Sequence, residues 1–199
     1  MDTIIKDIIT TSYRYFGCAF VFSILCSIVV QYCEKVGFKI LIKEWLFAIR
    51  NCSQFRKRIF FFFYTMIVLL TTVMNRDIFI NPLQSVMGDW YFEKNGSIKI
   101  DNIENILLFI PWSILFMMNF LNVLLIKKNL FICFFETLGI CFVFSTLIEV
   151  TQLIFHIGTF QLIDIFCNTT GGFIGELIFI IVYFFKKLIY SICNKKINK

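Results

Sequence analysis

Four polar residues in the C-terminal half of the sequence recur at the spacing of one helix face. Ser145, Glu149, Gln152 and His156 follow one another at steps of four, three and four residues. At about 100° per residue, these steps keep the four side chains within one narrow stripe of a helix. Carboxylate, amide and imidazole groups can bind polar ligands or transfer protons, so the stripe is suited to either chemistry.

A second polar stripe follows a short distance downstream. Asp164, Asn168, Gly171 and Gly175 are again separated by four, three and four residues, so this face is polar at its start and glycine-lined beyond. The short connection, residues 155–163, predicts an antiparallel helix pair in which the two stripes face each other. Because a Gly-x-x-x-Gly pair lets helix backbones approach closely, we predict that these glycines pack the hairpin.

A third segment brings one more amide to the same level. Asn105 begins an apolar stretch, and Pro111 would kink that helix and free a backbone carbonyl. A purely structural interpretation accounts for some of these residues, since amides can form interhelical hydrogen bonds and glycines can pack helices together. The coincidence of carboxylates, carboxamides and a histidine at one depth favours a ligand pocket. The candidate pocket residues are Asn105, Ser145, Glu149, Gln152, His156, Asp164 and Asn168, and the helix-packing residues are Pro111, Gly171 and Gly175.

These stripes belong to a chain with the composition of a helical membrane protein. Of its 199 residues, 59% are apolar and 16% are charged, against about 45–50% and about 25% in soluble domains. This excludes a disordered chain, an ordinary water-soluble enzyme and a nucleic-acid partner. Five stretches are long and apolar enough to span the bilayer: residues 16–32, 59–74, 105–126, 131–154 and 164–185. We predict an all-α integral membrane protein with about five transmembrane helices and a C-terminal antiparallel hairpin.

The eight cysteines are not arranged as a disulfide or metal framework. They contain no C-x-x-C pair, and most lie in apolar stretches, where a thiol packs as a small hydrophobic group. We therefore expect no metal site and no cofactor.

Positive charge indicates the orientation in the cell membrane. Residues 33–58, 127–130 and 186–199 carry fourteen Lys and Arg residues, against five on the opposite side. Because cytoplasmic loops retain positive charge, the multi-pass chain is predicted to have its N-terminus outside and its C-terminus in the cytoplasm. The acidic loop 75–104 is then outside and is long enough to cover the mouth of the bundle.

The basic inner loop has two interpretations. Ile42, Trp45, Leu46 and Ile49 recur at helical spacing, as in a helix lying on an anionic leaflet. The alternative is a loop that is positive only because it is cytoplasmic. Both remain open at this point.

The motifs resemble those of a known family. Residues 145–152 (Ser-Thr-Leu-Ile-Glu-Val-Thr-Gln), 158–160 (Gly-Thr-Phe) and 164–175 (Asp-Ile-Phe-Cys-Asn-Thr-Thr-Gly-Gly-Phe-Ile-Gly) are similar to the signature of the VanZ-like membrane proteins. Residues 105–111 resemble that family's earlier Asn-x-hydrophobic-Pro segment. The resemblance covers roughly residues 100–180.

The apolar spans, the charge distribution and the resemblance together predict a domain organisation, although the first two spans match the family only in hydrophobic character. Residues 1–104 would hold two N-terminal transmembrane helices with a basic inner and an acidic outer loop. Residues 105–185 would form a VanZ-like three-helix core, and residues 186–199 a basic cytoplasmic tail.

The resemblance also implies a function. The founding member of the family is associated with resistance to teicoplanin, a lipophilic glycopeptide that acts on cell-wall precursors outside the membrane. The leading hypothesis is therefore a membrane protein that lowers glycopeptide susceptibility through its outer pocket. Besides the lipid bilayer, its partner would be a lipid-linked cell-wall precursor or a lipophilic glycopeptide.

Three alternatives stay open. The first is a membrane-embedded enzyme for a lipid-linked substrate, with Glu149 or Asp164 as general acid or base. The second is a carrier for such a substrate, which would need its carboxylates near mid-membrane. The third is a purely structural helix bundle. Whether the chain is an enzyme is not decided by its sequence.

The predicted orientation can be tested by sided labelling. In a variant with the native cysteines replaced, His156→Cys in the connection 155–163 should react with a membrane-impermeant maleimide on intact cells, because this connection is predicted to lie outside. Lys187→Cys, in the basic tail, should react only after permeabilisation. Labelling with the opposite sidedness would invert the predicted topology.

Overall fold

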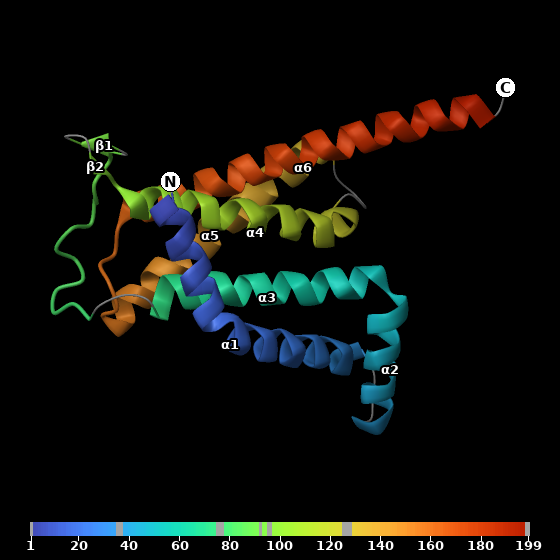
Figure 1. Ribbon diagram of the computed structural model, residues 1–199, viewed down its shortest axis with the longest axis horizontal. Coiled ribbons are helices and arrows are strands. Elements are labelled where there is room, and N and C mark those ends of the chain that lie inside the picture. The colour runs from blue at the N-terminus through green and yellow to red at the C-terminus, as the bar shows by residue number, and fades with distance from the viewer. Residues whose placement is uncertain are drawn as a thin grey trace.

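The computed structural model is built almost entirely from helices (Figure 1). It describes residues 2–34, 38–74, 78–91, 93–94, 97–124 and 129–197. Parts of the predicted loops, residues 35–37, 75–77, 92, 95–96 and 125–128, lie outside the described residues, as do Met1 and residues 198–199. The elements are α1 (Asp2–Glu34), α2 (Phe38–Asn51), α3 (Ser53–Met74), β1 (Glu93–Lys94), β2 (Ser97–Ile98), α4 (Ile100–Leu124), α5 (Leu130–Phe155) and α6 (Leu162–Ile197). The predicted all-α class is confirmed.

The chain is a multi-pass membrane protein. Among the described residues, four helices contain segments long and apolar enough to cross a membrane: Tyr13–Val30, Ser53–Met74, Ile100–Leu121 and Leu130–Phe155. The fifth predicted span, residues 164–185, lies in α6, which continues through the predicted basic tail to Ile197. As a membrane span, that segment stays a prediction.

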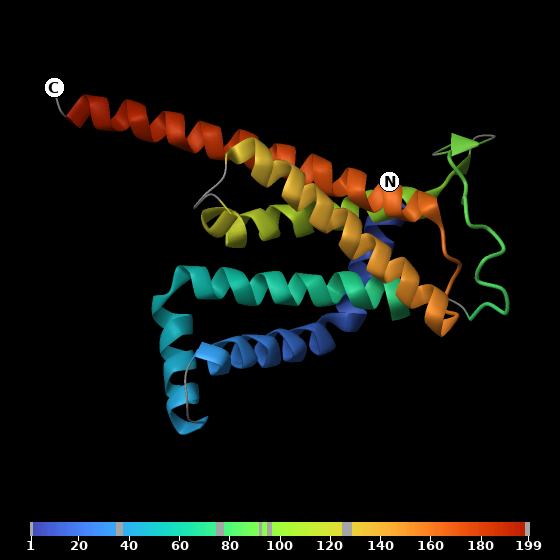
Figure 2. The same ribbon diagram turned by 180° about the vertical axis from the view of Figure 1, so that it is seen from behind.

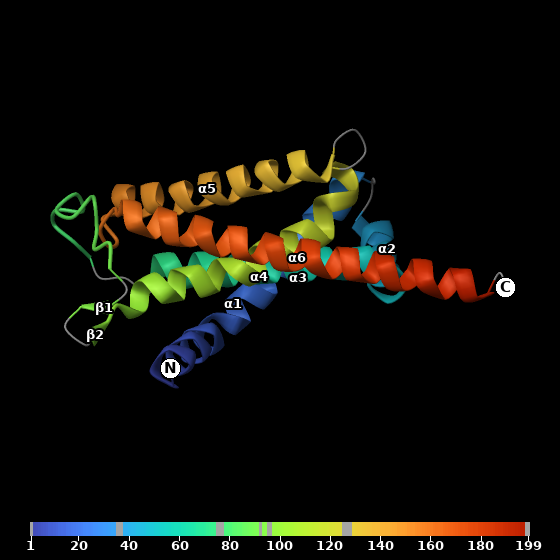
Figure 3. The same cartoon turned by 90° about the horizontal axis from the view of Figure 1, so that it is seen from above.

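Three long helices form the C-terminal part of the bundle. α5 and α6 run antiparallel, as the short connection between them requires, and α4 runs beside α6 in the same direction (Figures 1 and 3). α3 packs between α4 and α1, which completes the bundle (Figure 2). The C-terminal antiparallel hairpin is therefore present, but α6 makes its most extensive contact with α4.

Two glycines explain the close contact between α6 and α4. A Cβ atom at Gly171 would collide with the backbone carbonyl of Ile106, and one at Gly175 would collide with the carbonyl of Ile110 and with Ser113 Oγ. The sequence analysis expected these glycines to pack against α5. Instead Gly172, about 100° around the helix, faces α5, where a Cβ would lie 2.7 Å from Cys141 Sγ.

Pro111 lies inside α4, and the helix is assigned without a break from Ile100 to Leu124. Since proline has no N–H, the carbonyl of Leu107 loses its usual helical donor. Beside it, the Tyr64 hydroxyl of α3 donates to the Leu108 carbonyl at 3.0 Å. The proline thus marks a place where α3 supplies a hydrogen bond to the backbone of α4.

An aromatic core joins α3, α4 and α5. The ring of Trp112 stacks on Phe144 with centroids 4.8 Å apart and lies 5.7 Å from the ring of Phe61. Its indole N–H donates to Thr65 Oγ1 at 3.0 Å, which satisfies its only polar group. One buried tryptophan of α4 therefore contacts both α3 and α5.

α2 is a helix, as one of the two interpretations of the basic inner loop requires. It lies across the ends of α1 and α3 (Figure 1). The Trp45 indole N–H donates to Ser27 Oγ of α1 at 2.9 Å, while Ile42 and Leu46 are exposed. This arrangement suits a helix on the membrane surface, a placement that stays a prediction.

The α6–α4 contact predicts a specific sensitivity to added volume. Gly175→Ala should lower stability by about 1–3 kcal/mol, because the new methyl group has no space against α4. The matched control is Gly139→Ala in α5, where nothing lies within 4 Å of the added Cβ. Thermal unfolding of the purified variants measures both effects. Equal stability of the two variants would contradict the tight contact.

Candidate functional site

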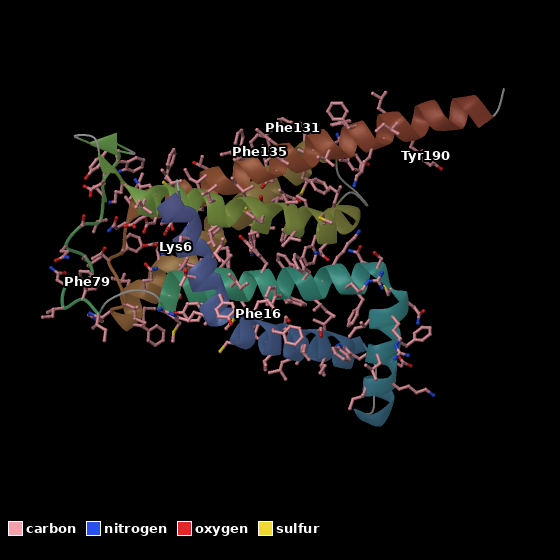
Figure 4. The ribbon with its side chains drawn as sticks, in the orientation of Figure 1. Lys6, Phe16, Phe79, Phe131, Phe135 and Tyr190 are labelled. Atoms are coloured by element: carbon pink, nitrogen blue, oxygen red, sulfur yellow. The ribbon has the colours of Figure 1, made fainter. Side chains whose placement is uncertain are left out.

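The polar residues gather where the loop before α4 meets the connection between α5 and α6. Three backbone hydrogen bonds join these segments: Phe79 N to His156 O at 2.9 Å, Phe160 N to Pro82 O at 2.9 Å and Leu162 N to Val86 O at 2.8 Å. Phe79 lies at the end of the bundle opposite to Tyr190 of α6 (Figure 4). As expected, the described part of the loop lies over this end of the bundle.

His156 ends α5 and does not join the buried polar residues. It adopts a left-handed conformation with φ 57°, and its backbone N–H bonds to carbonyls in the last turn. Its side chain is exposed, and Nδ1 lies 3.3 Å from the carbonyl oxygen of Phe79. Its role in the structure is that of a helix cap.

Asn168 and Ser145 connect the two predicted stripes directly. The Asn168 amide donates to Ser145 Oγ at 2.9 Å, and both side chains are buried between α6 and α5. The predicted meeting of the stripes therefore occurs at this pair. The Asn168 carbonyl oxygen is left without a hydrogen-bond partner in the described part of the chain.

Glu149 of α5 lies beside the segment that leads into α6. Its side chain is 1% exposed, and Oε2 accepts a hydrogen bond from the backbone N–H of Gln161 at 2.9 Å. Asp164, also buried, lies in the first turn of α6. The unpaired N–H groups and the dipole at a helix N-terminus favour negative charge, so the fold offers both carboxylates a suitable environment.

Gln152 connects the site to α3. Its Nε2 donates to the carbonyl of Thr72 at 2.8 Å, and its side chain is 1% exposed. Thr72 is the last buried residue of α3, so this bond fixes the end of α3 against α5. The Gln152 carbonyl oxygen has no hydrogen-bond partner among the residues described.

α4 contributes two asparagines, one of which the sequence analysis missed. Asn105 is buried, as is Asn102, whose amide donates to the carbonyls of Asp89 and Tyr91 at 3.1 Å each. Asn102 precedes Asn105 by three residues, a helical spacing that could have identified it. It fixes the loop against the start of α4.

A lysine from the loop also lies near the site. Lys99 forms an ion pair with Asp89 at 3.0 Å. The backbone carbonyl of Asp89 accepts from the amide of Asn102, so the ion pair lies beside that buried asparagine. The sequence analysis did not identify this ion pair.

Four amide side chains at this end share a property that Asn119 of α4 also has at the other end. Each is buried with one amide atom that has no hydrogen-bond partner in the described structure: Asn102, Asn105, Gln152 and Asn168. An unsatisfied buried polar group costs about 1–3 kcal/mol, and a hydrogen bond to a polar ligand or to water removes this cost.

The described residues offer no obvious metal site. No group of three or more His, Cys, Asp or Glu side chains in the described ranges could hold a metal ion. What the site does offer is amide donors and acceptors beside two buried carboxylates. This arrangement suits the binding of a neutral polar or cationic group through hydrogen bonds.

Residues 58–183 match the VanZ/LLP1 family. The chain belongs to this family. It is also similar to Protein VanZ of Enterococcus faecium, with 29% identity over 108 residues, which are 54% of each chain. The chain therefore spans about half the length of that relative. No solved structure matches the chain.

The VanZ/LLP1 match covers the elements that hold the site. It begins in α3, includes the loop before α4, and ends in α6 at Tyr183. It thus extends further toward the N-terminus than residues 100–180, where the resemblance was recognised. Thr72 and Asp89, which hold Gln152 and Asn102, both fall within it.

The contact between Ser145 and Asn168 can be measured by a double-mutant cycle. Ser145→Ala and Asn168→Ala should each destabilise the protein, and together they should show a coupling of about 0.6 kcal/mol and at most about 1.7 kcal/mol. Unfolding of the two single variants and the double variant in detergent gives this value. The pair Thr146→Ala and Asn168→Ala is the control, since the Thr146 hydroxyl bonds within its own helix to Phe142 O at 2.8 Å. Strict additivity for Ser145 and Asn168 would contradict the contact.

Proposed function

We propose that this VanZ/LLP1-family protein lowers susceptibility to lipophilic glycopeptides such as teicoplanin. It would do so by binding an amphipathic, wall-associated molecule at the polar end of the bundle. The observation that carries the proposal is the group of buried amides with unsatisfied atoms around α5 and α6. The resemblance to the VanZ-like proteins supplies the link to glycopeptides.

The chemistry of this end supports a ligand with a polar head. The four amides and two carboxylates suit a peptide-like or sugar-bearing group, which carries many hydrogen-bond donors and acceptors. In the predicted orientation, this end faces outward, where cell-wall precursors and glycopeptides are located.

The surroundings of the site support a ligand that also has an apolar part. Trp90 of the loop lies 5.3 Å from the ring of Phe166 on α6, and both side chains are exposed. Ile154 and Phe155 at the end of α5 are exposed as well. Tryptophan is favoured at membrane interfaces, so a lipid-linked precursor could contact apolar side chains while its head reaches the amides.

Two substitutions that change little volume test the proposal. Glu149→Gln and Asp164→Asn remove the charge of the buried carboxylates and keep their shape. In a strain that the intact protein protects, each should reduce protection against teicoplanin roughly tenfold, as expected for the loss of about 1.4 kcal/mol of binding. Minimal inhibitory concentrations measure the effect, after immunoblots show equal membrane levels.

Asn168→Leu is the third variant, because it removes an amide whose carbonyl oxygen is unsatisfied. Thr146→Val is the matched control on α5, since its hydroxyl bonds only to its own helix among the hydrogen bonds described. Unchanged protection in all three site variants would remove the polar end from the mechanism. Loss of protection together with loss of membrane protein would favour a purely structural role.

A further inference from the structure

A cavity of about 210 Å³ lies at the end of the bundle opposite to the polar site. Its walls come from α3, α4 and α6. Apolar side chains form most of the lining, among them Met117, Leu121 and Val182, and Lys57, Tyr183 and Lys186 complete it. The described lining includes two cations and no acidic side chain.

The two lysines come from distant parts of the chain. Lys57 lies in the first turns of α3, and Lys186 lies beyond the part of α6 that packs on the polar site. Both line the same cavity, and Lys57 follows α2 closely in sequence. α2 crosses this end of the bundle, and α6 extends past it toward the C-terminus (Figure 1). This end carries the excess of Lys and Arg and is therefore the predicted cytoplasmic side.

The walls of the cavity are held in place by buried contacts. The side-chain amide of Asn119 in α4 donates to the backbone carbonyl of Lys57 at 3.2 Å, and the backbone carbonyl of Asn119 accepts from the amide of Gln54 at 2.9 Å. Met117 is fully buried, and its sulfur lies 3.3 Å from the Thr137 hydroxyl of α5. The position of Lys57 relative to the apolar wall is thus set by side-chain hydrogen bonds between α3 and α4.

We propose that this cavity binds the headgroup of an anionic phospholipid from the cytoplasmic leaflet. Lys57 and Lys186 bind the phosphate, and an acyl chain begins along the apolar wall of α4 and α6. Basic pockets between transmembrane helices on the cytoplasmic side have the charge that such headgroups require. Tyr183 suits the boundary between headgroup and acyl chain, because its ring is apolar and its hydroxyl is polar.

The volume of the cavity suits a lipid headgroup better than a whole lipid molecule. Pockets for drug-sized ligands measure about 300–1,000 Å³, so this cavity is smaller than most of them. A headgroup fits in this volume while the rest of the lipid stays in the bilayer. The site is independent of the proposed glycopeptide function, which concerns the other end of the molecule.

Thermal unfolding of the purified full chain, titrated with defined lipids, tests the proposal. Phosphatidylglycerol added to detergent micelles should raise the unfolding temperature, and phosphatidylcholine should not. Lys57→Gln and Lys186→Gln should each raise the phosphatidylglycerol concentration at half-saturation about fivefold, because a lysine near an anionic lipid contributes on the order of 1 kcal/mol. The double variant should raise this concentration about 25-fold.

The matched control is a second double variant that also removes two positive charges. Lys43→Gln with Lys187→Gln removes two exposed lysines that do not line the cavity and should leave lipid binding unchanged. Val182→Trp, which fills space and keeps both lysines, should weaken the effect of phosphatidylglycerol. This variant tests the cavity without altering charge.

Three results would overturn the proposal. The first is an equal loss in both double variants, which would show general attraction to a basic surface. The second is a stabilisation by inorganic phosphate at the same concentrations, which would show an anion site that does not need the lipid. The third is the absence of any stabilisation by phosphatidylglycerol.

Discussion

The close packing of α6 against α4 is the constraint on which the rest of the site depends. Gly171 and Gly175 have no side chain, so the backbone of α6 lies directly on the carbonyls of Ile106 and Ile110. In lipid, helices gain nothing from hydrophobic burial against one another, and close van der Waals contact of this kind is a main source of association. This contact fixes the height and rotation of α6 in the bundle.

That rotation determines where the polar groups of α6 lie. With the glycine face on α4, Asn168 is buried against Ser145 of α5, and the start of α6 is beside Glu149. A carboxylate buried in this way needs donors, and the free N–H groups at the beginning of a helix provide them. A shift of α6 along α4 would separate Glu149 from the N–H of Gln161.

Much of this arrangement could be predicted from local periodicity. The helices, the hairpin and the two stripes follow from apolar length and from residues spaced three and four apart. The partner of Gly171 could not be predicted in this way, because periodicity identifies a face but not the helix that it meets. The roles of Thr72 and Lys99 were equally hidden, since they depend on contacts between separate segments. The spacing of Asn102 from Asn105 marks its helix face, but it does not give its partners in the loop. His156 shares the stripe spacing of α5, yet the helix ends there, so its side chain leaves that face.

The two ends of the bundle place their polar side chains differently. At the α5–α6 connection, polar side chains are buried, and several amide atoms find no partner within the described protein. At the other end, long lysine side chains lie beside an apolar cavity, and their flexible stems can carry the charge toward the lipid headgroups. Buried amides bind only a group that matches their geometry, whereas the lysines attract an anion and the apolar wall beside them adds a contact that a free anion cannot make. The first end is therefore suited to a polar group, and the second to a group that joins an anion to an apolar chain.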